Sequence, residues 1–135
     1  MIINKVLLVE DDPFLSSLLK NRLQKEGIEI TLAKDGEEAL SLLKSVKPNL
    51  ILLDLILPKK SGFEVMEEIR SDPQMQSQEM PIIIISNLGQ PEDISRGKAL
   101  GAIEYFVKAK TSIDELVQKI KDFLISSKNS SRNIL

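Results

Sequence analysis

Five polar residues directly follow apolar runs in this sequence, and their side chains could carry chemistry. Glu10 and Asp11 follow residues 6–9, Asp54 follows residues 50–53, Ser86 follows residues 82–85, and Lys108 follows residues 103–107. Any one of them is weak evidence, because strands commonly end in a polar residue. If the runs are parallel strands, their carboxyl ends meet at one edge of a sheet, where such proteins place their sites. We therefore expect three acids, a hydroxyl and an amine to converge there.

The three acids would carry the chemistry of such a site. Carboxylates within a few ångströms of one another repel, so either one is protonated or a cation binds among them. Oxygen ligands favour Mg²⁺, or Mn²⁺ in its place. Asp54 is then a candidate nucleophile toward a phosphoryl group and would form an acyl phosphate. Lys108 would offer a positive charge to the transferred oxygens, and Ser86 would offer a hydrogen bond.

The composition excludes many other kinds of site. The 135 residues include neither Cys nor His, which removes disulfides, thiolate metal sites, thiol nucleophiles and imidazole bases. A formal net charge of −2, a single Tyr and no Trp argue against direct nucleic-acid binding. No apolar stretch approaches the roughly 20 residues of a membrane span, and the sequence lacks a signal-peptide pattern. We expect a cytoplasmic protein without membrane insertion.

The elements that would position these residues alternate along the chain. Residues 6–9, 50–53, 82–85 and 103–107 are largely continuous apolar runs, typical of parallel strands covered on both faces. Residues 28–32 alternate with period two, as an edge strand with one solvated face would. Five βα units in about 125 residues predict an α/β fold, a doubly wound parallel sheet of five strands with five helices.

Five segments have apolar residues at helical spacing. They begin after Pro13, at Asp35, at Gly62, at Pro91 and at Ser112, and Gly27 ends the first of them. Asp12, directly before Pro13, is expected to cap the first helix. The four Phe side chains are all expected in the core: Phe14, Phe63, Phe106 and Phe123. We expect one domain at residues 1–125 and a polar, flexible C-terminal tail at 126–135.

Four longer motifs occur together in the sequence. They are V-E-D at 9–11, D-L-I-L-P-K-K-S-G at 54–62, I-I-I-I-S at 82–86 and G-A-I-E-Y-F-V-K at 101–108. With this set the chain resembles the receiver domain of two-component response regulators over residues 5–125, in the stand-alone, single-domain form. The resemblance implies a flavodoxin-like fold with strand order 2-1-3-4-5.

The resemblance also implies roles for the acids. Asp54 would be the phosphorylation site of this phosphoprotein. Asp11 and Asp54 would bind Mg²⁺ together with the backbone carbonyl of Ile56. Glu10 would act through a water or in a secondary metal-binding role.

Three further residues would respond to the phosphoryl group. Lys108 matches the family's phosphate-sensing lysine, and Ser86 and Tyr105 match its switch pair of a hydroxyl and an aromatic ring. Phosphorylation would repack the face formed by the helix after Pro91, the strand at 103–107 and the helix from Ser112. A downstream protein would bind this face, and a homodimer through the same face is left open.

The resemblance implies a phosphohistidine as the phosphoryl donor, and because the sequence holds no His, that residue would belong to another protein. The resemblance implies that the donor is a histidine kinase or a histidine phosphotransfer protein. No enzyme activity is expected beyond self-phosphorylation and slow autodephosphorylation.

Two positions depart from the family's pattern. Ala109 stands where the family usually has a proline in a cis bond, so Lys108 is presented either by a cis loop or by a trans loop. Asn87 stands where the family often has a small residue, and its side chain could narrow access to Asp54.

Three other interpretations stay open. A phosphohydrolase with an aspartate nucleophile often carries a second acid two residues later, where this sequence has Ile56. A degenerate receiver that acts as an unphosphorylated binding module is favoured only by Ala109 and Asn87. A flavodoxin-like FMN binder would have a Ser/Thr-rich phosphate loop after the first strand, which this sequence lacks.

Overall fold

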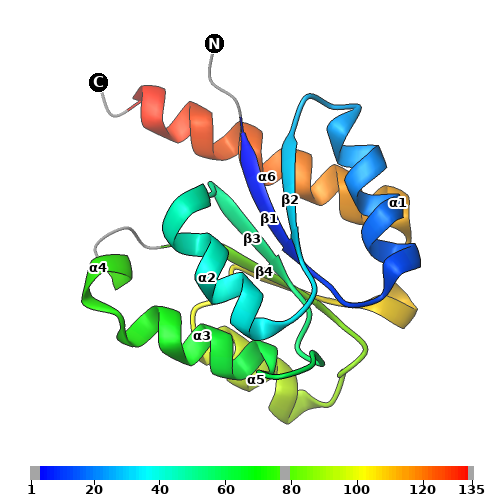
Figure 1. Ribbon diagram of the computed structural model, residues 1–135. Coiled ribbons are helices and arrows are strands. Elements are labelled where there is room, and N and C mark those ends of the chain that lie inside the picture. Colours follow the sequence, from blue (N-terminus) through cyan, green and yellow to red (C-terminus); the bar gives the residue numbers. More distant parts are fainter. Residues whose placement is uncertain (1–3, 77–79, 134–135) are drawn as a thin grey trace.

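A five-stranded parallel sheet forms the centre of the protein (Figure 1). The computed structural model describes residues 4–76 and 80–133. The strands are β1 (Lys5–Val9), β2 (Glu29–Ala33), β3 (Leu50–Leu53), β4 (Ile82–Ser86) and β5 (Glu104–Val107). Their order is β2-β1-β3-β4-β5, which confirms the predicted fold class and strand order.

Helices cover both faces of this sheet. They are α1 (Pro13–Gln24), α2 (Gly36–Val46), α3 (Gly62–Ser71), α4 (Pro73–Gln76), α5 (Pro91–Ala99) and α6 (Ile113–Asn133), with a 3₁₀ turn η1 (Lys108–Lys110) after β5. Side chains of α1 and α6 pack on one face of the sheet, and those of α2, α3 and the end of α5 pack on the other. The short α4 and η1 were not predicted, because four or fewer residues show no helical periodicity.

Alternating side chains of each strand supply the two cores. In β1, Val6 and Leu8 pack toward α1 and α6, whereas Leu7 and Val9 pack on the opposite face. Successive side chains of a strand point to opposite faces, so a strand covered on both sides must be apolar throughout. This explains why the three central strands β1, β3 and β4 are continuous apolar runs in the sequence.

Polar side chains start the helices at the carboxyl edge of the sheet. The Asp12 carboxylate accepts a hydrogen bond from the Phe14 N–H at 2.9 Å, which confirms its predicted capping role. Asp35 accepts in the same way from Glu38 at the start of α2, and Ser112 from Glu115 near the start of α6. These caps fix where α1, α2 and α6 begin relative to the strand that precedes each of them.

Two expectations need correction. Phe14 is 77% exposed: Leu15 and Ser16 of the same first turn of α1 face the core, whereas Phe14 faces solvent. Residues 126–133, expected to be a flexible tail, continue α6 as far as Asn133. This segment contains neither Gly nor Pro, the residues that would end a helix. The domain boundary at residue 125 stays a prediction.

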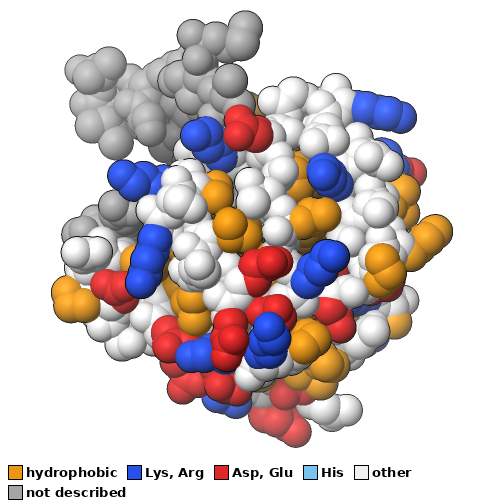
Figure 2. Space-filling view, viewed as in Figure 1, with side chains coloured by type: hydrophobic (Ala, Val, Ile, Leu, Met, Phe, Trp, Pro, Cys, Tyr) orange, Lys and Arg blue, Asp and Glu red, His pale blue; other side chains and the backbone are white. Residues whose placement is uncertain are grey.

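The surface carries both signs of charge. Figure 2 shows acidic and basic side chains interspersed with separate apolar ones on the face that it presents. A mixture of this kind agrees with the formal net charge of −2. Within the described part of the chain, no helix combines the length and the apolar character that crossing a membrane requires.

Candidate functional site

Three carboxylates meet at the carboxyl edge of the sheet. Glu10 and Asp11 follow β1, Asp54 follows β3, and one oxygen of each lies within 4.8 Å of the others. The two strands pair directly, with Val9 opposite Leu53, so the residues that follow them are brought side by side. Glu10 and Asp54 are buried, whereas Asp11 is exposed to solvent. The predicted convergence of the acids is therefore present in the fold.

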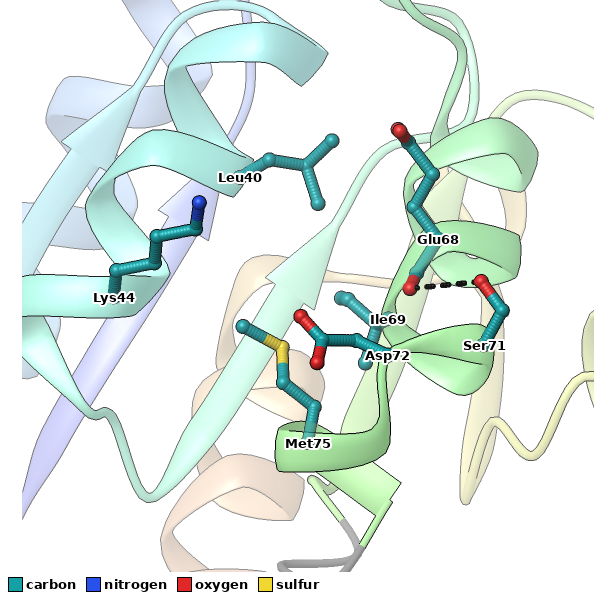
Figure 3. Close-up of a pocket in the computed structure, with 7 residues that line it drawn as sticks. All are labelled: Leu40, Lys44, Glu68, Ile69, Ser71, Asp72 and Met75. Carbon is teal, nitrogen blue, oxygen red and sulfur yellow. Dashed lines mark hydrogen bonds between the residues drawn. The ribbon is translucent and has the colours of Figure 1, made fainter.

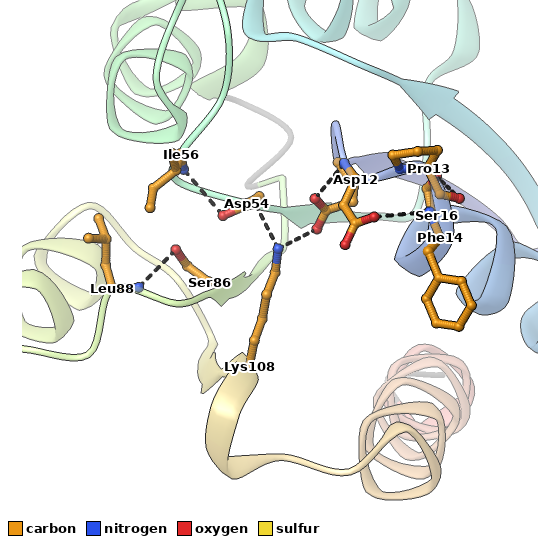
Figure 4. Close-up of polar contacts among 10 residues, drawn as sticks. Asp12, Pro13, Phe14, Ser16, Asp54, Ile56, Ser86, Leu88 and Lys108 are labelled. Atoms are coloured by element: carbon orange, nitrogen blue, oxygen red, sulfur yellow. Dashed lines mark hydrogen bonds and ion pairs between the residues drawn. The ribbon is translucent and has the colours of Figure 1, made fainter.

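Lys108 places its ammonium group between two of these acids. Its Nζ lies 2.8 Å from Oε1 of Glu10 and 2.8 Å from Oδ2 of Asp54. Figure 4 shows the lysine reaching up from η1 to the Asp54 carboxylate. The peptide after Lys108 is trans, as are all peptides of the described residues. The trans loop thus presents the lysine to the acids without a proline at position 109.

Burial and pairing determine the charge of this cluster. Burial raises the pKa of Glu10, although hydrogen bonds from Lys108 and from the Asp12 N–H act in the opposite direction. Burial alone would lower the pKa of Lys108, but its contacts with Asp54 and Glu10 outweigh burial and raise that pKa. The lysine therefore keeps its positive charge at neutral pH and offsets part of the negative charge around it.

The loop after β3 orients the Asp54 carboxylate. The Ile56 N–H donates to Oδ1 of Asp54 at 3.2 Å, so one carboxylate oxygen is held by the loop and the other by Lys108. The loop then turns back, and the Gly62 N–H donates to the Leu55 carbonyl at 2.9 Å. A Cβ on Gly62 would lie 2.3 Å from the Asp54 carbonyl oxygen, so only glycine fits there. A metal-binding role of the Ile56 carbonyl stays a prediction.

Leu88 links the two residues predicted to form the switch pair. Its N–H donates to Oγ of the buried Ser86 at 3.3 Å, and its carbonyl accepts a hydrogen bond from the Tyr105 hydroxyl. The Tyr105 ring packs against α5, where a Cβ on Gly97 would come within 3.1 Å of it. Sequence reasoning missed Leu88 because its backbone makes both contacts, and backbone groups carry no signal in a sequence.

The donor set fits a hard divalent cation. Glu10, Asp11 and Asp54 offer only carboxylate oxygens, and among the described residues no other group of three acids is close enough to share an ion. Mg²⁺ and Mn²⁺ prefer oxygen ligands and retain waters in their coordination shell. The exposed Asp11 leaves one side of the cluster open to solvent, as a partly hydrated ion requires.

A separate surface pocket lies between α2, α3 and α4, away from the acidic cluster. Its volume is about 310 Å³, and it is formed by the C-terminal halves of α2 and α3 together with α4 (Figure 3). Leu40, Ile69 and Met75 supply its apolar lining, and Lys44 and Asp72 add charge. It shares no residue with the acidic cluster, and no sequence motif points to it.

The response regulator receiver domain is the family whose model matches residues 6–121, almost the whole fold described above. The chain belongs to this family. Among curated relatives, the transcriptional regulatory protein CpxR of Klebsiella pneumoniae is 40% identical over 121 residues, which are 90% of this chain and 49% of CpxR. The receiver domain described here thus spans about half the length of that relative.

Two solved response regulators have similar sequences and folds. The phosphorylated cyanobacterial phytochrome response regulator RcpA is 32% identical with a TM-score of 0.77, and the match covers 90% of this chain and 91% of RcpA. The Mn²⁺-bound form of response regulator Rcp1 is 31% identical with a TM-score of 0.78, covering 90% and 94%. Both agree with the family assignment of this receiver domain.

Proposed function

We propose that this receiver domain accepts a phosphoryl group on Asp54 from a phosphohistidine of a histidine kinase or a histidine phosphotransfer protein. The observation that carries the proposal is a buried Asp54 carboxylate with two acids beside it and an ammonium group 2.8 Å away. A carboxylate oxygen of Asp54 would form a bond to phosphorus while the P–N bond to the imidazole breaks. The bonding electrons stay on the imidazole nitrogen, which then takes up a proton.

Glu10, Asp11 and Asp54 would hold a Mg²⁺ or Mn²⁺ ion, with the Ile56 carbonyl as a further ligand. Such an ion neutralises charge on the phosphoryl oxygens during transfer. The oxygen-only donor set supports this assignment, and so does the similarity to Rcp1, which was solved in a Mn²⁺-bound form. The phosphorylated state of RcpA likewise supports phosphorylation of this chain.

Lys108 and Ser86 would bind the transferred group. The ammonium of Lys108 already contacts Asp54, so it is placed to donate to an oxygen of a phosphoryl group on that residue. Ser86 is the last residue of β4, at the same edge of the sheet, and its hydroxyl would donate to another oxygen. Preorganised donors of this kind stabilise the negative charge of the bound phosphoryl group.

Phosphorylation would change a protein-binding face through Leu88. If the Ser86 hydroxyl turns toward the phosphoryl group, the Leu88 N–H loses its acceptor, and the loop that holds the Tyr105 hydroxyl is released. The face of α5, β5 and α6 would then repack and bind a downstream protein or a second copy of the domain. Output through protein contacts needs neither nucleic-acid binding by this domain nor a membrane, and a cytoplasmic location stays our expectation.

The domain would act as a phosphoprotein rather than as an enzyme that turns over substrate. Position 56, two residues after the nucleophile, holds an exposed Ile whose side chain cannot protonate a leaving group. Self-phosphorylation and slow autodephosphorylation are therefore the reactions we expect.

Intact mass measured after incubation with acetyl phosphate and Mg²⁺ tests this proposal. The wild type should gain about 80 Da, one phosphoryl group. Asp54→Asn should gain nothing, and Asp122→Asn, a control on the exposed side of α6, should behave as the wild type. Continuous phosphate release over many turnovers would favour the hydrolase, and no adduct from acetyl phosphate or from a kinase would favour the unphosphorylated binding module.

A further inference from the structure

The start of α2 presses against the loop that carries Asp54. We call residues 54–61 the phosphoacceptor loop. The Gly36 N–H donates to the Pro58 carbonyl of this loop at 3.4 Å. A Cβ on Gly36 would lie 2.4 Å from the Lys60 carbonyl oxygen and 2.6 Å from the Lys60 Cβ. Backbone atoms cannot move aside as a flexible side chain can, so any side chain at position 36 must displace the loop or the helix.

The contacted part of the loop has an unusual backbone. Lys59 has a φ of +69°, in the left-handed region that residues with a Cβ adopt rarely. Such a conformation persists only where surrounding contacts hold it. Its ammonium lies 3.7 Å from the carboxylate of Asp35, the residue that caps α2. The backbone contact at Gly36 and this ion pair together attach the loop to the start of α2.

The loop residues that contact the start of α2 lie close in sequence to Ile56, whose N–H orients the Asp54 carboxylate. Ile56, whose N–H donates to Asp54, precedes Pro58 by two residues. At its other end the loop is closed by the hydrogen bond between Gly62 and Leu55. A displacement at positions 58–60 would therefore have to be taken up largely by residues 56–57, since the hydrogen bond between Gly62 and Leu55 holds the two ends of the loop together.

Helix formation does not by itself require glycine at position 36. Glycine is a poor helix former, and Asp35 already caps α2 through the N–H of Glu38. The close approach of the loop does require it. We propose that Gly36 is a positioning residue, whose missing side chain lets α2 hold the phosphoacceptor loop so that Asp54 and the Ile56 carbonyl can bind a divalent cation. This inference rests on the function proposed above.

Calorimetric titration of Mn²⁺ into the full chain tests the inference directly. Gly36→Ala should bind Mn²⁺ at least about 10-fold more weakly, the loss typical when a group that orients a ligand is disturbed. Its phosphorylation by acetyl phosphate at saturating Mg²⁺ should also slow, because the Asp54 carboxylate is no longer held in place. In ¹⁵N spectra of the metal-free protein, the amide signals of Ile56 and Gly62 should shift.

Leu43→Val is the matched control. Leu43 is a buried residue of the same helix, so this variant loosens the packing of α2 without touching the loop. It should lose stability but keep the wild-type Mn²⁺ affinity. Equal Mn²⁺ affinities of Gly36→Ala and Leu43→Val at a temperature where both are folded would overturn the inference.

Lys59→Gln provides a second test, on a side chain that is largely exposed to solvent. Removing a positive charge near a cation site would tighten Mn²⁺ binding if only electrostatics mattered. If the inference holds, loss of the ion pair with Asp35 loosens the attachment of the loop to α2, and Mn²⁺ binding should become weaker instead. Tighter binding would contradict the inference. A wild type that neither binds Mn²⁺ nor takes up phosphate would instead reject the proposed function itself.

Discussion

The ammonium nitrogen of Lys108 lies 2.8 Å from Oδ2 of Asp54, and Lys108 is the first residue of the 3₁₀ turn η1, whose peptides are trans. The same nitrogen contacts Glu10, so one cation compensates two buried carboxylates. Removing the cation from such a buried cluster lowers stability, because the carboxylates stay out of water and no longer have a positive charge beside them. The lysine should therefore matter for stability as well as for phosphorylation.

Lys108→Met should lower the free energy of unfolding at neutral pH without metal by roughly 3–5 kcal/mol, the cost of removing one partner from a buried charged pair. Urea unfolding in the presence of a chelator measures this loss. The difference from wild type should shrink as the pH falls through the raised pKa of Glu10, since a protonated Glu10 needs no cation. Lys110→Met, which changes an exposed lysine of the same turn, should leave stability nearly unchanged. An equal loss in both variants would contradict the pairing.

Asp11 and Asp12 are neighbours with different predicted roles. In the wild type, Mg²⁺ at ten times its dissociation constant should stabilise the fold by about 1.4 kcal/mol. Asp11→Asn should abolish most of this gain, because it removes a carboxylate ligand. Asp12→Asn should retain it, since Asn caps a helix as well as Asp does. Thermal melts with and without Mg²⁺ measure this stabilisation in each variant. If Asp12→Asn lost it and Asp11→Asn kept it, Asp12 would be the metal ligand.

Tyr105 offers a direct optical test of the link through Leu88. It is the only Tyr of a sequence without Trp, so intrinsic fluorescence reports on this ring alone. Phosphorylation of the wild type should change the emission, because the hydroxyl loses its hydrogen bond to the Leu88 carbonyl. Ser86→Ala should still be phosphorylated but should show a much smaller change, while Asp54→Asn should show none. A full change in phosphorylated Ser86→Ala would exclude the Ser86 hydroxyl as the trigger.

Most of the fold could be predicted because buried parallel strands leave continuous apolar runs. The prediction for β3 matches its observed limits, and the edge strand predicted at 28–32 lies one residue later, at Glu29–Ala33. The acids were predictable for the same reason, since strand topology alone decides which strand ends become neighbours. The contact of Gly36 with Lys60 was not, because it depends on how closely a helix and a loop approach in space.

Phe14 shows where residue type alone misleads. An aromatic ring next to an apolar helical stripe was predicted to be buried, yet its position in the first turn of α1 leaves it 77% exposed. Phe14→Ala should therefore change the free energy of unfolding by less than about 0.5 kcal/mol. Phe63→Ala should cost about 3–5 kcal/mol, because that ring is buried and also packs beneath the guanidinium of Arg96. Urea unfolding compares the two, and a large loss for Phe14→Ala would contradict the observed exposure.

Asn87 follows the switch serine directly, and its side chain is exposed at the edge where Asp54 lies. If this side chain limits the approach of water to the acyl phosphate, Asn87→Ala should shorten the lifetime of phosphorylated Asp54, because a smaller residue leaves the phosphorus more accessible. The decay of the phosphorylated mass after removal of acetyl phosphate measures this lifetime. Asn21→Ala, an exposed Asn of α1, is the matched control and should decay at the wild-type rate. An unchanged lifetime in Asn87→Ala would remove the basis for this role of Asn87.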